Sequence, residues 1–137
     1  MRIQRMRVLV NDQDKARSFY TEKLGMVIKD DHVREDGLGW VTVVSPEDPE
    51  GTELVLVTTR DPGLAQWQKV LFDALVPAVS LSVDNFPDAH DLLEARGAVF
   101  RTVSANWGGY VMVFVDDGCG NLVEVYHEFE EEPDPGW

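Results

Sequence analysis

Val8-Leu9-Val10-Asn11-Asp12 sets the pattern for the whole chain, because a similar stretch, Leu81-Ser82-Val83-Asp84-Asn85, opens a second segment of the same design. In both segments a short apolar run reads as a strand, and apolar residues then recur at helical spacing. Asp12 and Asn85 stand where the first helical turn needs a side-chain acceptor for its free N–H groups. The sequence therefore predicts two strand-helix units, each with a capped helix.

Each predicted helix ends at a glycine. Gly25 lies 15 residues after Val10, and Gly97 lies 14 residues after Val83. Glycine suits the left-handed residue that follows a helix, and these two glycines occupy equivalent places in the two segments. The matched lengths indicate that the two halves are copies of one unit.

The second part of each copy agrees with the first part. Residues 40–44 and 110–115 are runs of β-branched and aromatic residues, each followed by a polar turn and another strand. Glu53 and Glu124 both lie nine residues after the end of their run. We therefore expect the two glutamates to occupy equivalent positions on the last strand of each half.

With weaker strands at 26–30 and 98–102, each half reads as βαβββ, which predicts an α+β fold of two tandem modules. Apolar spacing at 64–71, between the modules, predicts a short helix that carries Trp67. The predicted parts of this single structural domain are a first βαβββ module at 1–58, a linker at 59–76, a second βαβββ module at 77–127 and an acidic tail at 128–137.

Length and composition exclude several classes of protein. A chain of 137 residues, 44% of them hydrophobic, fits one folded domain rather than several domains or a disordered segment. Its net charge of −13 repels nucleic-acid phosphates and anionic lipids, so neither nucleic acid nor a membrane is an expected partner. The N-terminus lacks an apolar stretch, which predicts a cytoplasmic protein. Cys119 is the single cysteine, so no intramolecular disulfide is expected.

The paired βαβββ pattern, a Phe19-Tyr20 pair before Leu24-Gly25, and Gly120-Asn121-Leu122-Val123-Glu124 near the end together resemble the vicinal oxygen chelate superfamily. This superfamily includes glyoxalase I, extradiol dioxygenases, fosfomycin-modifying enzymes and bleomycin-binding proteins, and the resemblance covers roughly residues 3–127. It implies that each half curls its strands into paired curved sheets with a shared cup. The resemblance also implies a homodimer, and it allows the cup to be completed within one chain or across two.

In the metal-using members four side chains converge on a divalent cation, and the resemblance carries these positions over to Arg5, Glu53, Ala78 and Glu124. Only the two glutamates can bind a metal, because a guanidinium stays protonated and alanine has no donor atom. Two carboxylates alone leave most metal ligands to water or substrate. We therefore expect no metal or other cofactor, and instead a bridge from Arg5 to one of the glutamates.

Alternation along the strands assigns further residues to the cup, because side chains two apart share a face of a sheet. If Glu53 and Glu124 face inward, an aromatic and apolar lining surrounds them, with a Gly-rich loop at the rim. Such a lining is typical of small-molecule sites, and the alternative interpretation is that it fills the space between two sheets. The predicted ligand-binding residues are Arg5, Trp40, Trp107, Tyr110, Met112, Phe114 and Tyr126.

Three functions are consistent with this lining. The first is a metal-independent binding protein for a cationic or aromatic small molecule, similar to the bleomycin-binding type. The second is an enzyme, a glyoxalase-like lyase, isomerase or dioxygenase acting on a small oxygenated substrate. In that enzyme a divalent metal would activate the substrate, or Glu124 or Glu53 would act as general base while Arg5 holds an oxyanion. The third is an interaction module whose own side chains fill the cup.

Overall fold

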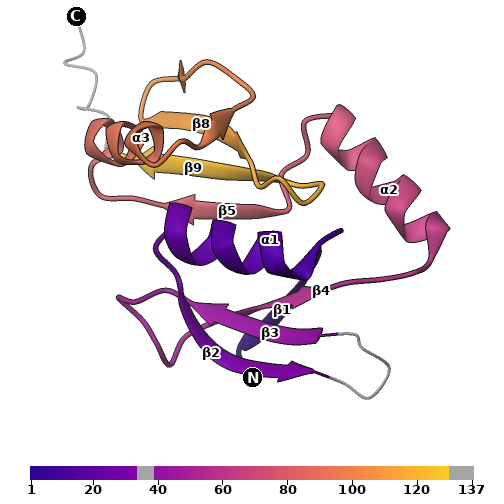
Figure 1. The fold of residues 1–137 in the computed structure, drawn as a ribbon. Helices are drawn as coiled ribbons and strands as arrows, with labels where there is room; N and C mark the ends of the chain where they lie inside the picture. The colour runs from indigo at the N-terminus through magenta and orange to yellow at the C-terminus, as the bar shows by residue number, and fades with distance from the viewer. Residues whose placement is uncertain (34–38, 130–137) are drawn as a thin grey trace, which may run out of the picture.

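The computed structural model describes residues 1–33 and 39–129 and shows two successive βαβββ halves, which confirms the predicted α+β fold (Figure 1). The first half contains β1 (Arg5–Leu9), α1 (Gln13–Ser18), a π-helical turn (Phe19–Lys23), β2 (Val27–Val33), β3 (Gly39–Val44) and β4 (Glu53–Val57). The linker forms α2 (Pro62–Asp73). The second half contains β5 (Val79–Ser82), α3 (Phe86–Ala95), β6 (Val99–Phe100), β7 (Ala105–Asn106), β8 (Tyr110–Asp116) and β9 (Leu122–Glu128).

Each half folds into its own mixed sheet. The strand order is β1-β4-β3-β2 in the first sheet and β5-β9-β8-β6 in the second, with β7 paired to β8. In both sheets the first and last strands of the half lie side by side and parallel, and the other pairs are antiparallel. Glu53 lies opposite Arg5 and Glu124 lies opposite Ser80, so the two glutamates occupy equivalent strands as predicted.

Both predicted helix caps form. The side chains of Asp12 and Asn85 each accept a hydrogen bond from the backbone N–H three residues later, over 3.0 and 3.1 Å. The two predicted stop glycines follow their helical segments with positive φ angles, 76° at Gly25 and 78° at Gly97. A side chain at either position would strain the backbone, which explains why both copies end with glycine.

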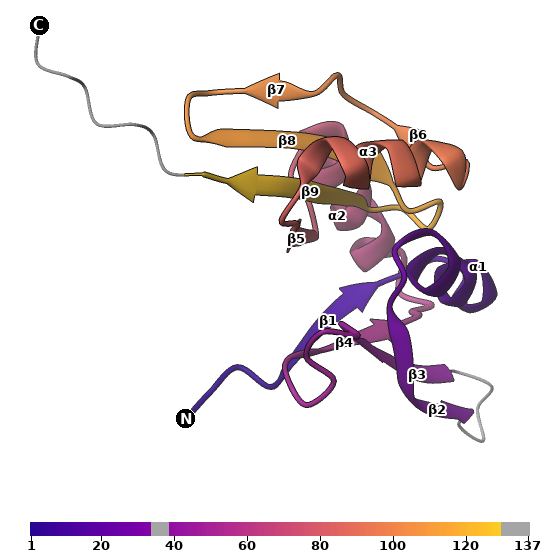
Figure 2. The same cartoon turned by 90° about the vertical axis from the view of Figure 1, so that its left-hand side faces the viewer.

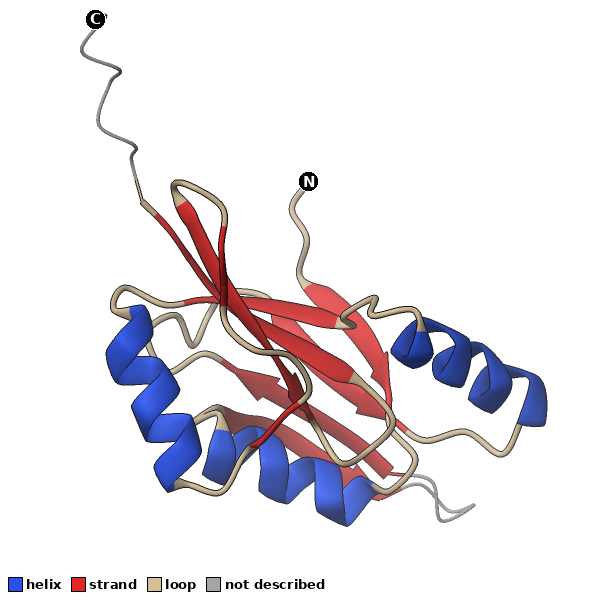
Figure 3. Ribbon diagram, turned by 90° about the horizontal axis from the view of Figure 1, so that it is seen from above, coloured by secondary structure: helices blue, strands red, loops and turns tan. Residues whose placement is uncertain are grey.

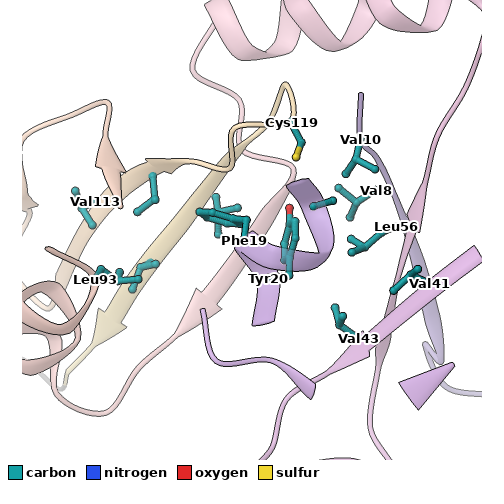
Figure 4. Close-up of a cluster of buried hydrophobic side chains, with 14 of the residues drawn as sticks. Val8, Val10, Phe19, Tyr20, Val41, Val43, Leu56, Leu93, Val113 and Cys119 are labelled. Atoms are coloured by element: carbon teal, nitrogen blue, oxygen red, sulfur yellow. The ribbon is translucent and has the colours of Figure 1, made fainter. Parts of the chain in front are cut away.

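The Phe19-Tyr20 pair lies in the π-helical turn that continues α1, and its rings meet edge to face with centroids 5.2 Å apart. Figure 4 shows this pair between the two sheets, with Phe19 toward the second sheet and Tyr20 toward the first. Both side chains are buried. One helical segment therefore supplies core residues to both halves and joins them.

The two sheets share one hydrophobic core around α1. Every second residue of β3 and of β8 belongs to this core, as the predicted alternation requires. The opposite faces of the sheets, which carry Glu53 and Glu124, are turned away from the core. The buried core residues are Val8, Val10, Ala16, Phe19, Tyr20, Val41, Val43, Leu56, Phe86, Leu93, Val113, Val115, Cys119, Val123 and Val125.

A buried polar cluster also ties the first half to the second. The Tyr20 hydroxyl donates a hydrogen bond of 3.0 Å to the carboxylate of Asp117, and both residues are almost fully buried. Asp117 also accepts hydrogen bonds from the Asn121 side-chain amide and from the backbone N–H groups of Cys119 and Asn121. Burial raises the pKa of Asp117, and these hydrogen bonds act in the opposite direction. The turn before β9 is thereby fixed against the helical segment of the first half.

Several predicted boundaries differ from the structure. The strand predicted at 26–30 extends to Val33 as β2, the strand predicted at 98–102 is shortened to β6, and the short strand β7 lies beyond the predicted range. Pairing with β8 is interrupted between β6 and β7, where the Thr102 hydroxyl, rather than a backbone carbonyl, accepts a hydrogen bond from the Phe114 N–H over 3.0 Å. Strand β9 runs to Glu128, the first residue of the predicted acidic tail, and residues 130–137 of that tail lie outside the described residues.

The linker helix is longer than the predicted 64–71, because Asp61 caps it and a proline occupies its first turn. Figure 3 shows α2 at the opposite end of the molecule from α3. The Gln68 side-chain amide anchors α2 by donating to the carbonyls of Leu9 (2.8 Å) and Cys119 (3.2 Å), one in each half. Among the described residues, no helix has the length and apolar character needed to cross a membrane.

Tyr20→Phe keeps the ring but removes the hydroxyl that donates to Asp117. We expect the free energy of unfolding to fall by about 1–3 kcal/mol, because a buried acceptor loses a partner. Urea denaturation followed by circular dichroism measures this change. The same substitution at the half-buried Tyr126 serves as control and should cost less than about 0.5 kcal/mol. Equal stability of Tyr20→Phe and the wild type would contradict the role assigned to this hydrogen bond.

Candidate binding faces

The predicted site residues lie on two sheet faces that are turned away from the shared core. The first cup face is this side of the first sheet, formed by alternate residues of β1, β3 and β4: Arg5, Arg7, Trp40, Thr42, Glu53 and Val55. The second cup face is this side of the second sheet, formed by alternate residues of β5, β8 and β9: Ser80, Tyr110, Met112, Phe114, Glu124 and Tyr126.

Glu53 is held by two cations on the first cup face. Its Oε2 accepts a hydrogen bond of 2.8 Å from Arg5 Nε, and Lys29 Nζ lies 3.2 Å from its Oε1. Only 4% of the Glu53 side chain is exposed. The hydrogen bond from Arg5, followed by the one from Lys29, holds the pKa of Glu53 below its ordinary value. The predicted bridge from Arg5 to one of the two glutamates thus forms with Glu53.

Lys29 is a charged residue of this face that sequence reasoning misses. The pairing register of β2 with β3 shifts between Ile28 and Asp30, so Lys29 sits at an irregular point of the strand. Such an irregularity breaks the alternation from which faces are assigned. Lys29 is therefore able to reach Glu53 and, at 3.7 Å, Glu50.

Trp40 packs against the cations of β1. The guanidinium carbons of Arg5 and Arg7 lie 5.8 and 5.9 Å from the centroid of its ring, within the range of cation–π attraction. Thr42 and Val55, which lie on the same face, are fully buried even in one chain. This part of the first cup face is therefore covered by its own side chains.

Three aromatic rings form a stack on the second half, which we call the aromatic ladder: Trp107, Tyr110 and Tyr126. The centroids of Trp107 and Tyr110 are 6.3 Å apart, and those of Tyr110 and Tyr126 are 5.3 Å apart, with interplanar angles of 13° and 18°. The ladder begins at the turn between β7 and β8, and Figure 2 shows this hairpin extending past β5 and α3. Trp107 is 68% exposed, so the end of the ladder is open to solvent.

Glu124 lies beside the aromatic ladder. Burial, followed by a hydrogen bond with Glu124, raises the pKa of Tyr110 to about 12. Tyr110 is therefore a neutral phenol near neutral pH. Across the β8–β9 pair, Phe114 lies opposite Glu124 and Met112 lies opposite Tyr126. Met112 is only 4% exposed, so it forms the base of this face rather than an open wall.

The structure brings predicted residues together within each face but does not bring the two faces together. The ion pairs and ring contacts described above each stay within one half. Neither Glu53 nor Glu124 lines any of five cavities of about 210 to 480 Å³ in the described part of the chain. Arg5 and Glu124, which the sequence analysis placed around one centre, therefore lie on separate surfaces of one chain.

The donor set does not fit the metal centre of the metal-using members. Both oxygens of Glu53 already contact cations, and Arg5 occupies the position of a second ligand. Opposite Glu124, the register places Ser80 rather than the predicted Ala78, and neither residue supplies an imidazole, a thiolate or a carboxylate. Among the four positions, only Glu124 offers a carboxylate without a cation bound to it in the described structure.

Other potential ligands and nucleophiles lie elsewhere. His90, Asp91 and Glu94 approach one another on α3, on the core side of the second sheet, and the His90 ring stacks on Phe100 with centroids 4.5 Å apart. Cys119 is fully buried, and burial raises the pKa of its thiol to about 12. A thiol that stays protonated at neutral pH is a poor nucleophile. Cys119 is therefore unsuited to act as a catalytic thiol.

Known proteins match this chain over nearly its whole length. A family model described as the Glyoxalase/Bleomycin resistance protein/Dioxygenase superfamily matches residues 2–125. The uncharacterized protein YurT of Bacillus subtilis (strain 168) is 37% identical over 118 residues, which cover 86% of this chain and 92% of that protein.

Solved structures share the fold. UcmS2 superposes with a TM-score of 0.79 at 25% identity, covering 92% of this chain and 97% of that chain. TnmS3 from Streptomyces sp. CB03234, described as an antibiotic binding protein, superposes with a TM-score of 0.65 at 24% identity, covering 94% and 97%. The paired βαβββ halves, the matching family model and the similar sequence of YurT agree, and the chain belongs to the glyoxalase/bleomycin resistance protein/dioxygenase superfamily.

Proposed function

We propose that this protein binds a small aromatic molecule without a metal ion, in a site that a second copy of the chain completes. The observation that carries this proposal is the aromatic ladder, a stack of three rings that ends at the exposed Trp107. A flat ring surface that is open to solvent at one end suits a planar organic ligand.

Stacking a further ring on the ladder would remove apolar surface from water. Covering such surface contributes about 25 cal/mol per Å². An offset aromatic pair adds about 0.5–1.5 kcal/mol to this. The rings of Tyr110 and Tyr126 are already stacked on each other, which restrains both side chains before a ligand arrives. Little side-chain freedom is therefore lost when a ligand binds.

The same contacts give less support to an enzyme. A general base works best when its pKa lies near the working pH, whereas Arg5 and Lys29 hold the pKa of Glu53 down. Glu124, the other candidate base, lies on a different face from Arg5, which would have to hold an oxyanion. An interaction module with a filled cup accounts for the covered part of the first cup face but leaves the exposed end of the ladder unexplained.

A relative of this fold is compatible with binding. TnmS3 is described as an antibiotic binding protein. At 24% identity the likeness concerns the fold alone. Support for binding in this chain therefore comes from its own aromatic ladder.

A second copy of the chain would supply the missing wall of the site. The two cup faces look away from their shared core, so a twofold pair can place the first cup face of one copy against the second cup face of its partner. The two faces would supply different parts of such a site, because the first face carries the Arg7 guanidinium and the second carries the exposed end of the aromatic ladder. The homodimer implied by the family resemblance is part of this proposal.

Trp107→Ala should weaken binding of the neutral planar probe 2-naphthalenemethanol about 10-fold, because the open end of the ladder is lost. Isothermal titration calorimetry measures the affinity. Trp67→Ala is the matched control, since Trp67 is also an exposed tryptophan (58%) but lies on α2. Equal effects of the two substitutions, or no binding of the probe tighter than millimolar, would count against the ladder as the binding surface.

Protein purified without chelator should contain no stoichiometric divalent metal, because Arg5 and Lys29 occupy both oxygens of Glu53. Elemental analysis by plasma mass spectrometry measures the content, and treatment with EDTA should leave the affinity for 2-naphthalenemethanol unchanged. One equivalent of a transition metal that resists dialysis, together with loss of probe binding in EDTA, would overturn the metal-independent function.

Light scattering coupled to size-exclusion chromatography should give twice the chain mass of 15.4 kDa, because each site needs a cup face from two chains. Dilution should weaken dimer formation and probe binding together. A monomer that still binds the probe with full affinity would show that one chain suffices.

A further inference from the structure

We propose that Arg7 is the anion-binding residue of this site, so that the aromatic molecule bound there carries an anionic group such as a carboxylate or sulfonate. Such a ligand presupposes the binding function proposed above and specifies its charge. Three sets of contacts point to Arg7: the pairing of the neighbouring cations, the residues in its own row of the sheet, and its position against Trp40.

The two other cations of the first cup face already have a carboxylate. Arg5 and Lys29 contact separate oxygens of Glu53, at 2.8 and 3.2 Å. A carboxylate with both oxygens engaged and 4% of its side chain exposed has no room for a third cation. Arg7 projects from the same side of β1, two residues beyond Arg5, and forms no ion pair with any carboxylate in the stretches 1–33 and 39–129.

The residues in the same row of the sheet offer Arg7 no carboxylate within reach. Its partner on β4 is Val55, and Thr42 follows on β3, both of them fully buried and uncharged. Asp30 comes next, on β2. Three strand spacings separate Asp30 from Arg7, about 14 Å between the backbones, which exceeds direct contact. The Arg7 guanidinium therefore lacks a local anion although the chain carries a net charge of −13.

Trp40 positions Arg7 for a ligand. The Arg7 guanidinium carbon lies 5.9 Å from the Trp40 ring centroid, and that of Arg5 lies 5.8 Å from the same ring. Contact with the ring restrains the long side chain before a ligand arrives, so less freedom is lost on binding. Two guanidinium groups on one ring also repel each other, and an anion beside Arg7 would relieve this repulsion. The planar fork of a guanidinium matches a carboxylate in two hydrogen bonds.

This local arrangement outweighs the overall charge of the chain. The net charge of −13 alone would favour a cationic ligand. Charges farther away than about 8–10 Å are largely screened at physiological salt, so the charge nearest the ligand decides which ligand is held. Arg7 is the cation of the first cup face that has no carboxylate beside it in the described part of the chain, so it is the charge that acts on a ligand bound there.

Three probes with one ring system and different charges test this assignment: 2-naphthoate, 2-naphthalenemethanol and 2-naphthylmethylammonium. We expect calorimetry on the full chain to show naphthoate binding about 10-fold or more tightly than the alcohol, because charge-assisted hydrogen bonds are the stronger kind. Arg7→Gln should remove this preference, so that naphthoate and the alcohol bind the variant with similar affinities. Arg2→Gln is the control, since it removes the same charge from the exposed N-terminal stretch before β1.

The outcomes separate the two proposals. Equal affinities for the three probes, or tightest binding of the ammonium compound, would overturn the role of Arg7 and leave aromatic binding standing. Binding of all three probes weaker than millimolar would count against both. A loss of naphthoate affinity in Arg2→Gln equal to that in Arg7→Gln would show a general charge effect and overturn the assignment. Unchanged melting temperature in Arg7→Gln establishes that the variant is folded, and Arg7→Lys should retain part of the preference, because it keeps the charge but not the planar fork.

Discussion

The packing of α1 and its π-helical turn between two sheets constrains the rest of the molecule. Phe19 and Tyr20 are neighbours in the sequence, yet they serve the second and the first sheet respectively (Figure 4). The Tyr20 hydroxyl also reaches the buried carboxylate of Asp117, 97 residues away. Because the helix side of each sheet packs into this shared core, the opposite side of each sheet is turned outward. Two outward cup faces on one chain are the consequence.

The two cup faces differ in chemistry although they derive from one repeated pattern. The first cup face carries charged side chains, and its Glu53 forms ion pairs with Arg5 and Lys29. The second holds stacked rings, which end at the exposed Trp107. A surface of charges alone binds small ions weakly in water, and a surface of rings alone selects poorly among flat molecules. A ligand that met both faces would gain affinity from the rings and selectivity from the charges, which is a physical reason for the proposed site between two chains.

The order of strands and helices can be predicted from the sequence, because it depends on local rules. The caps at Asp12 and Asn85, and the alternation of core residues along β3 and β8, follow from spacing alone. The position of Lys29 could not be predicted in this way, because a register shift in β2 breaks the alternation of faces. The sequence also did not predict that Ser80 lies opposite Glu124. The register of β5 on β9 is set by pairing across the sheet, whereas the prediction counted residues from the helix cap. The separation of the two faces depends on packing between residues far apart in the chain, which a local pattern cannot encode.

Replacing a metal ligand by Arg5 changes what chemistry the scaffold can perform. A divalent ion polarises an oxygen of the substrate and lowers the pKa of bound water, so it can drive a reaction. A guanidinium is permanently protonated, accepts no lone pair from a substrate and supplies no hydroxide, but it forms oriented hydrogen bonds to anions. Because Arg5 is paired with Glu53, we assign anion binding to Arg7. Arg7 lies two residues along the same strand and against the same Trp40 ring. An arginine at this position is therefore better suited to the proposed recognition of a ligand than to metal-dependent catalysis.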